Sequence, residues 1–182
     1  KRDMIKVLAN DGISELGVQI LKENGFEVNT KKINQEDLIQ KINEENYEVL
    51  LVRSATKVRK DIIDQCPGIK IIGRGGVGMD NIDVSYAKEK NIHVINTPAA
   101  SSSSVAELVF AHLFGMVRYL YISNRQMPME GDTNFKNLKK SYSSGRELSG
   151  KTLGIIGFGR IGQEVAKRGI GLGMNIMAHD KF

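Results

Sequence analysis

Short apolar runs alternate with amphipathic stretches along the first half of the chain. The runs are rich in β-branched side chains, which predicts strands, and the stretches between them have helical spacing. Alternation of this kind is typical of an α/β fold with a parallel sheet. The predicted strands are residues 5–9, 27–30, 49–53, 70–73 and 93–97, and the predicted helices lie near 14–24, 35–43, 59–65 and 83–89.

The pattern changes after about residue 100. A long helix is predicted from Ser103 to Asn124, and its most apolar part, residues 105–117, is expected to be buried in a core. The polar passage 125–150 that follows is interpreted as a crossover or subunit arm. Apolar runs at 152–156 and 174–178 then flank another helical pattern, so a domain boundary is expected within 100–105 and the second sheet is expected to have two strands.

Residues 157–162 read G-F-G-R-I-G between a predicted strand and a predicted helix, and Asp180 follows 23 residues after the first glycine. This context is typical of a dinucleotide-binding fingerprint. Gly157 permits the tight turn, Gly159 lets a pyrophosphate approach the backbone, and Gly162 allows close helix packing. The helix amino end adds partial positive charge. Asp180 can bind ribose hydroxyls and repel a 2′-phosphate, which predicts NAD rather than NADP, although Lys181 beside it weakens that preference.

Polar or glycine-rich segments follow the predicted strands of the first half. Ligands of an open parallel sheet bind at the carboxyl ends of its strands, so these segments outline an anion-receiving cleft. Arg53 can present a planar fork to a carboxylate or phosphate, and the backbone N–H groups of residues 75–78 can form a nest for a second anion. Alternatively, Arg53 and Arg74 are solvated loop charges and the glycines only turn the chain. The segments are residues 10–12, 53–57, 74–78 and 96–98.

Composition and charge narrow the classes of function. The 182 residues are 41% hydrophobic and 26% charged, as in soluble globular proteins. The net charge of +5 is scattered along the chain, so nucleic acid is not expected as the principal partner. No signal peptide is visible and no stretch approaches about eighteen uncharged apolar residues, so neither secretion nor membrane spanning is expected. Cys66 is the single cysteine, which excludes an internal disulfide and favours a reducing, cytoplasmic setting.

The few candidate metal ligands and acid–base groups are dispersed. His93 opens a strand, His112 lies in the apolar helix and His179 lies on the adenosine side, so each is interpreted as structural and no metal site is predicted. Asp80 and Asp83 resemble an acid–base pair, but Asp83 fits better as the N-cap of the helix that follows it.

Several of these motifs together resemble the D-isomer-specific 2-hydroxyacid dehydrogenases. The match runs from Ile5 to Asp180, and residues 52–58 resemble, more narrowly, the D-3-phosphoglycerate dehydrogenases of that family. The resemblance implies a flavodoxin-like substrate domain in residues 1–102, followed by the start of a Rossmann NAD-binding domain in residues 103–182 that includes a dimer-forming arm at 125–150. The motifs that carry it are residues 73–83, 96–98, 104–108 and 153–162.

The same resemblance implies hydride transfer between NAD and C2 of a D-2-hydroxy acid. The expected substrate is 3-phosphoglycerate, in the first step of serine biosynthesis. Ser101 stands where phosphoglycerate members commonly have an asparagine, so a glyoxylate or hydroxypyruvate reductase remains open. The substrate contacts implied are Arg53, Ser54, Gly75, Gly76, Val77 and Gly78, and the NAD contacts implied are Gly157, Gly159, Arg160, Ile161, Gly162 and Asp180.

The catalytic arginine, acidic residue and histidine of the family are expected beyond Phe182, so the 182 residues alone are expected to be inactive. A homodimer or higher homo-oligomer is expected, with a small 2-hydroxy or 2-oxo acid as the other partner. The alternative from another class is an NAD-sensing interaction protein like the family's transcriptional corepressors. Residues 53–57 contain cationic and hydroxyl side chains suited to binding a phosphate, which counts against that alternative.

Overall fold

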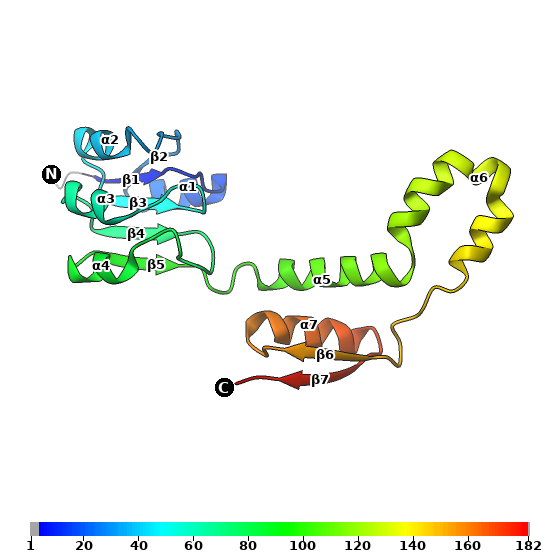
Figure 1. Ribbon diagram of the computed structural model, residues 1–182. Helices are drawn as coiled ribbons and strands as arrows, with labels where there is room; N and C mark the ends of the chain where they lie inside the picture. The colour runs from blue at the N-terminus through cyan, green and yellow to red at the C-terminus, as the bar shows by residue number, and fades with distance from the viewer. Residues whose placement is uncertain (1–3, 182) are drawn as a thin grey trace. The chain divides into compact units, whose positions relative to one another are not determined.

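The computed structural model describes residues 4–181, which belong to two compact units (Figure 1). The first unit ends at Ala100 and the second begins at Ser101, inside the range 100–105 expected for the boundary. Each unit has a sheet and a hydrophobic core of its own.

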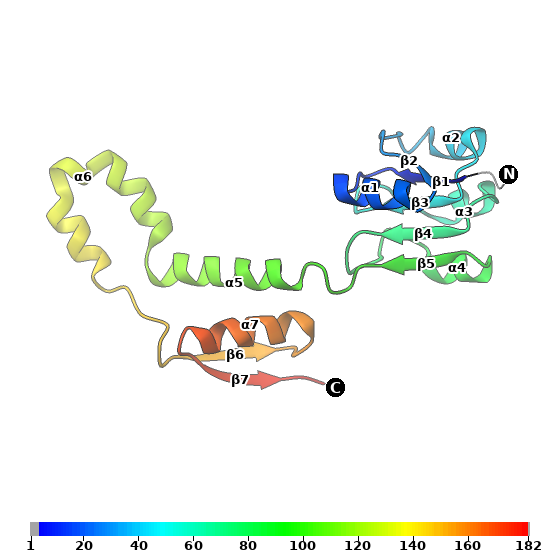
Figure 2. The same cartoon turned by 180° about the vertical axis from the view of Figure 1, so that it is seen from behind.

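Five parallel strands form the sheet of the first unit, in the order β2-β1-β3-β4-β5 (Figures 1 and 2). This is the flavodoxin-like order, in which the chain changes direction across the sheet between β1 and β3. The predicted parallel α/β architecture is confirmed, with bounds that shift by a few residues at most. The elements are β1 Ile5–Ala9, α1 Glu15–Glu23, β2 Phe26–Asn29, α2 Leu38–Glu45, β3 Val49–Val52, α3 Lys60–Gln65, β4 Ile71–Arg74, α4 Val84–Glu89 and β5 His93–Asn96.

The core of this unit lies between one face of the sheet and helices α2, α3 and α4. Leu8 and Leu50 from the strands pack against Leu38 and Ile62 from the helices, and all four are almost completely buried. Removing this apolar surface from water is the main stabilising term of such a layer. Cys66 ends α3 inside the same core, where burial raises the pKa of its thiol to about 11, as expected for an unreactive helix-end thiol.

The second unit contains, within the described residues, a two-stranded parallel sheet and three helices. Strand β6 (Thr152–Ile156) pairs with β7 (Asn175–His179), and α7 (Arg160–Gly171) connects them. Helix α5 (Ser102–Val117) packs on α7 through Ala106 and Phe110, which meet Val165 and Met174 in a small core. The two-stranded second sheet matches the expectation from the sequence.

The prediction of one continuous, buried helix over 103–124 is wrong. Helix α5 ends at Val117, and α6 (Leu120–Tyr142) begins after Tyr119, whose φ of 57° is left-handed and cannot continue an α-helix. Within α5 only one stripe is buried, because α7 covers only one side of a helix that is apolar all round. Leu108 is 57% exposed and Met116 is 70% exposed.

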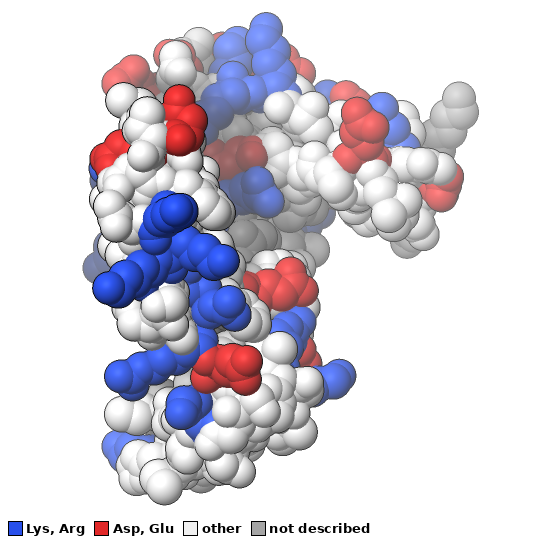
Figure 3. Space-filling model, turned by 90° about the vertical axis from the view of Figure 1, so that its right-hand side faces the viewer, with Lys and Arg blue, Asp and Glu red and all other residues white. Residues whose placement is uncertain are grey.

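Helix α6 occupies most of the predicted polar passage. It contains Pro128 and a non-helical residue, Asn134, so it is kinked rather than straight. Its last turn carries Lys139 and Lys140, and Lys and Arg side chains gather on the face seen from this side (Figure 3). No single helix among residues 4–181 is both long and apolar enough to cross a membrane. Helices α5 and α6 meet the two criteria only when they are counted together, across the bend of 53° between them.

Candidate functional site

The turn between β6 and α7, residues 157–159, has a backbone that requires glycine. Gly157 has a φ of 93°, in the left-handed region that side chains rarely adopt. A Cβ on Gly162 would lie 2.2 Å from the carbonyl oxygen of Gly157, so only glycine lets α7 begin this close to β6. A Cβ on Gly159 would meet no atom within 4 Å, so this residue borders open space. Each of the three glycines therefore has the surroundings that its predicted role requires.

Asp180 lies beside the amino end of α7, next to the glycine-rich turn. Gly159 is the N-cap of α7 and gives it no side-chain cap, so the first-turn N–H groups of Arg160 and Ile161 can bind an anion. The parallel pairing of β6 with β7 continues into a hydrogen bond from the N–H of Gly157 to the carbonyl of His179, at 2.8 Å. Asp180, one residue further, accepts a hydrogen bond from the N–H of Phe158.

This arrangement fits a dinucleotide. The open side of Gly159 and the uncapped helix end suit a pyrophosphate, and a carboxylate at the end of the neighbouring strand suits ribose hydroxyls. An ionised carboxylate accepts several hydrogen bonds, so its contact with Phe158 is compatible with a ribose partner.

In the first unit, the structure brings the loop after β3 and the turn after β4 together. Strands β3 and β4 pair, and the N–H of Gly75 donates to the carbonyl of Val52 at 2.9 Å. A Cβ on Gly75 would lie 3.6 Å from Cγ of Arg53, so the arginine side chain lies directly against this turn. Arg53 and Ser54 are both exposed. The predicted substrate residues from the two segments are thus neighbours.

The loop after β5 is joined to the same turn. The amide of Asn96 donates to the carbonyl of Val77 at 2.8 Å, and the N–H of Thr97 donates to the carbonyl of Gly76 at 3.1 Å. Carboxyl ends of adjacent parallel strands meet at one edge of a sheet, which explains why three separate sequence segments converge here.

The predicted nest at residues 75–78 is only partly available. The N–H groups of Gly75 and Gly76 donate to the carbonyls of Val52 and Arg74. Among the described residues, the N–H groups of Val77 and Gly78 have no protein acceptor, so these two can bind an anion. Gly76 has a separate role, because a Cβ there would lie 2.1 Å from Nη1 of Arg74.

Two further residues shape this site; residues 10–12 were expected to border the cleft, but neither Asp11 nor Asn81 had been assigned a role of its own. Asp11, just after β1, accepts hydrogen bonds from the N–H groups of Arg53 and Thr56 and from the side chains of Thr56 and Lys32. Asn81 donates to the carbonyls of Arg53 and Thr56. The position of Asp11 beside the β1–β3 change of direction is a signal that could have found it.

The Asp11 carboxylate is held ionised. Burial raises its pKa, but the hydrogen bonds from Lys32, Arg53 and Thr56 together outweigh burial and lower the pKa to about 2. Its side chain is only 4% exposed, so this charge faces the protein.

The prediction that Asp83 caps the helix following it, α4, is wrong. Asp83 occupies the N-cap position of α4 but makes no cap hydrogen bond there. Its carboxylate instead accepts the N–H of Lys60 at 3.1 Å and Nη1 of Arg59 at 3.0 Å, so it caps α3. The parallel bridge between Val58 and Ile82 brings the two segments side by side.

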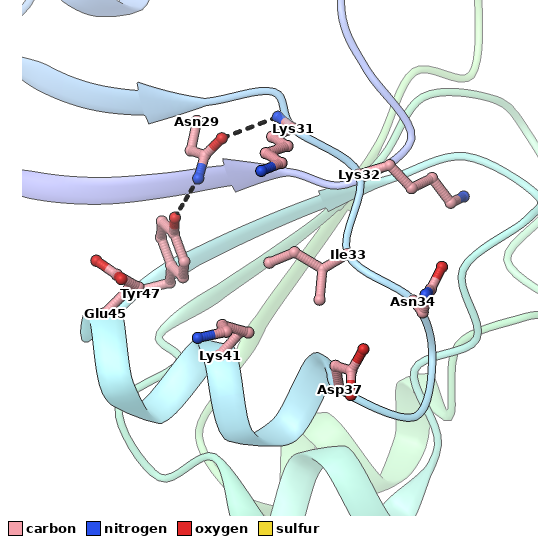
Figure 4. A pocket seen from close by; sticks show the side chains of 9 residues that line it. All are labelled: Asn29, Lys31, Lys32, Ile33, Asn34, Asp37, Lys41, Glu45 and Tyr47. Carbon is pink, nitrogen blue, oxygen red and sulfur yellow. Dashed lines mark hydrogen bonds between the residues drawn. The ribbon is translucent and has the colours of Figure 1, made fainter.

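A cavity of about 360 Å³ lies between the segment after β2 and α2 (Figure 4). Its wall includes Lys31, Lys41, Glu45 and Tyr47, and the Tyr47 hydroxyl accepts a hydrogen bond from the amide of Asn29 at 2.6 Å. No residue predicted for the substrate or the cofactor lines it. Among residues 4–181, no three His, Cys, Asp or Glu side chains lie close enough together to hold a metal ion.

Comparison with known proteins decides the family. A family model described as D-isomer specific 2-hydroxyacid dehydrogenase, catalytic domain, matches residues 7–168. The chain belongs to this family. The resemblance seen in the sequence is thereby confirmed, and the matched residues include the loop after β3, the turn at Gly75 and the glycine-rich turn after β6.

Relatives of this chain include proteins with different substrates in their names. It is 46% identical to a hydroxypyruvate reductase of Thermotoga maritima, over 96% of this chain and 55% of the relative. It is 43% identical to a D-3-phosphoglycerate dehydrogenase of Methanocaldococcus jannaschii, over 98% of this chain and 33% of the relative. The chain thus spans about a third to about half of these relatives.

A solved structure also matches. The NAD⁺-bound 3-phosphoglycerate dehydrogenase of Entamoeba histolytica has a TM-score of 0.72 and 32% sequence identity to this chain, covering 98% of it and 55% of the other chain.

Proposed function

We propose that the chain is part of an NAD-dependent oxidoreductase that transfers a hydride between the nicotinamide and C2 of a D-2-hydroxy acid. The observation that carries this proposal is the glycine-rich turn with its open side at Gly159 and Asp180 hydrogen-bonded across it. Membership of the family and the NAD⁺ bound to the Entamoeba histolytica relative support it.

In this proposal each residue of the turn has a defined task. The N–H groups of Arg160 and Ile161 bind the pyrophosphate, helped by the positive end of α7. Asp180 orients the adenosine ribose and disfavours a 2′-phosphate, which selects NAD over NADP. NAD, when bound, supplies the carbon that accepts or donates the hydride.

We propose 3-phosphoglycerate as the substrate. Arg53 presents a fork of donors suited to a phosphate, with the Ser54 hydroxyl beside it. The N–H groups of Val77 and Gly78 bind the carboxylate in the turn against which Arg53 lies. The Methanocaldococcus jannaschii relative supports this assignment.

A hydroxypyruvate or glyoxylate reductase is the second candidate, favoured by the Thermotoga maritima relative and by Ser101 at the position where phosphoglycerate members commonly have asparagine. Steady-state kinetics of the full-length protein, with 3-phosphoglycerate and NAD and with hydroxypyruvate and NADH, separates the two. Arg53→Ala should raise KM for 3-phosphoglycerate far more than for hydroxypyruvate. The control is Lys88→Ala, which removes an exposed positive charge on α4, outside this loop. Equal losses for both acids would show that Arg53 binds the carboxylate and that the phosphate assignment is wrong.

We also propose that the full-length protein is a homodimer that uses α5 and α6. Large apolar side chains are exposed along both helices, among them Met116 at 70% and Met129 at 80%, and exposed apolar surface of this extent marks an interaction site. Sedimentation of the double variant Met116→Glu, Met129→Glu should give a monomer with an unchanged fold. A dimer that persists would place the interface elsewhere.

A further inference from the structure

We propose that Asp11 and Asn81 are positioning residues that clamp the β3 loop, residues 53–56, and so set the positions of Arg53 and Ser54 toward the substrate. This role rests on the proposed function, because it assigns a purpose to the loop that Arg53 occupies. Neither residue is placed in contact with the substrate.

The Asp11 half of the clamp holds the N–H groups of the loop. Oδ2 accepts the N–H of Arg53 at 2.7 Å and the N–H of Thr56 at 3.0 Å. Oδ1 accepts the hydroxyl of Thr56 at 2.8 Å and the ammonium of Lys32 at 2.7 Å. All four partners are donors, so only an ionised carboxylate satisfies them.

The Asn81 half holds the carbonyls of the same two residues. Its Nδ2 donates to the carbonyl of Arg53 at 2.8 Å and to that of Thr56 at 2.6 Å. Asn81 is only 6% exposed, so its side chain is fixed by packing. Arg53 and Thr56 therefore have both backbone polar groups bound, and loss of either partner would leave a polar group of the buried Thr56 unsatisfied.

The residues between the two clamped positions are left for a ligand. Among the described residues, the N–H groups of Ser54 and Ala55 and the hydroxyl of Ser54 have no protein partner. A loop with fixed ends and free donors at its tip is preorganised to receive an anion, which reduces the entropy lost on binding.

Electrostatics and positioning predict opposite effects of Asp11→Asn, which makes the proposal testable. Removing a negative charge near an anion site, with no other change, would tighten anion binding. In the asparagine variant, however, one carboxylate oxygen becomes an NH₂ group that faces N–H, O–H or ammonium donors, so the loop loosens. A displacement of about 1 Å can weaken productive binding by as much as about 100-fold.

The experiment compares Asp11→Asn and Asn81→Leu with the wild type in the full-length protein. The matched control is Asp64→Asn, because Asp64 also accepts hydrogen bonds from a lysine and a hydroxyl, of Lys90 and Tyr86, at the surface of the same unit. Each positioning variant should raise KM for 3-phosphoglycerate or hydroxypyruvate at least about tenfold, with kcat and the KM for the dinucleotide of that reaction, NAD or NADH, nearly unchanged. The control should change none of these. A lower KM in Asp11→Asn would show a purely electrostatic role and overturn the proposal.

Hydrogen exchange and coupling with Arg53 complete the test. Amide protection of residues 53–56 should fall in both positioning variants while that of β3 and β4 is kept, and retained loop protection would refute the clamp. Adding Asp11→Asn to Arg53→Ala should raise KM little further, whereas independent, multiplicative effects would contradict positioning through Arg53. If the wild type oxidises or reduces neither acid, the proposed function fails. The clamp is then tested separately, by comparing the amide protection of the loop and the calorimetric affinity for inorganic phosphate between the wild type and the positioning variants.

Discussion

Gly162→Ala should damage both the packing of α7 and the binding of NADH. The added Cβ would lie 2.2 Å from the carbonyl oxygen of Gly157 and 3.3 Å from Cγ2 of Ile155. The nearer atom belongs to the backbone and cannot rotate away, so the amino end of α7 must move away from β6 by about 1 Å to restore normal van der Waals contact.

The size of the effect follows from that displacement. Overpacking of this kind costs about 1–3 kcal/mol, against a gain of up to about 1 kcal/mol from replacing glycine by alanine in a helix. The net loss of unfolding free energy should be about 1–2 kcal/mol. A shift of about 1 Å in the N–H groups that face the pyrophosphate should weaken NADH binding by about 10- to 100-fold.

Gly171→Ala is the matched control, since it adds the same methyl group to the same helix. A Cβ at Gly171 meets no atom within 4 Å, so this variant should be as stable as the wild type or slightly more stable, with unchanged NADH affinity. Urea unfolding and NADH titration by fluorescence, both on the full-length protein, measure the two quantities. Gly162→Ala with wild-type stability and wild-type NADH affinity would refute the assignment of this glycine to close packing.

Two predictions concern the carboxylates of the first unit. Asp83→Ala should lower the unfolding free energy by about 0.5–2 kcal/mol, because α3 loses its cap and Arg59 loses its partner. The control is Asp80→Ala, measured in the same way. Equal losses of unfolding free energy in the two variants would contradict the capping role of Asp83. The pKa of Asp11 is about 2 in the folded chain against 3.8 for an unperturbed aspartate, which corresponds to about 2 kcal/mol of stability at neutral pH. Because the folded pKa is the lower one, this contribution is present above about pH 4 and is lost as pH falls toward 2. The stability difference between wild type and Asp11→Asn should therefore shrink over that range, and a difference independent of pH would contradict the ionised contact.

Local sequence signals predicted the parts of the fold that depend on local conformation. The glycine-rich turn is one example, because the left-handed φ of Gly157 and the tight packing at Gly162 leave a direct mark on residue type. The parallel sheet is another, since buried strands are short, continuous apolar runs.

The parts that were missed depend on contacts between distant segments. Asp11, Asn81 and Asp83 each bind the backbone of another segment, and the register of parallel strands decides which segment that is. The break at Tyr119 occurs without glycine or proline, so the sequence carries no local mark of it. The exposure of α5 follows from how little of its surface α7 covers, which the apolar pattern of one helix cannot indicate.

The most direct test of the account is NADH titration of the full-length protein and its Gly159→Ala variant. Gly159 has a φ of −71° and open space where a Cβ would be, so alanine should leave the thermal unfolding midpoint unchanged. The same methyl group occupies the space assigned to the pyrophosphate, so NADH affinity should fall by at least about tenfold. No NADH binding by the wild type, or equal binding by both proteins, would contradict a dinucleotide site at this turn.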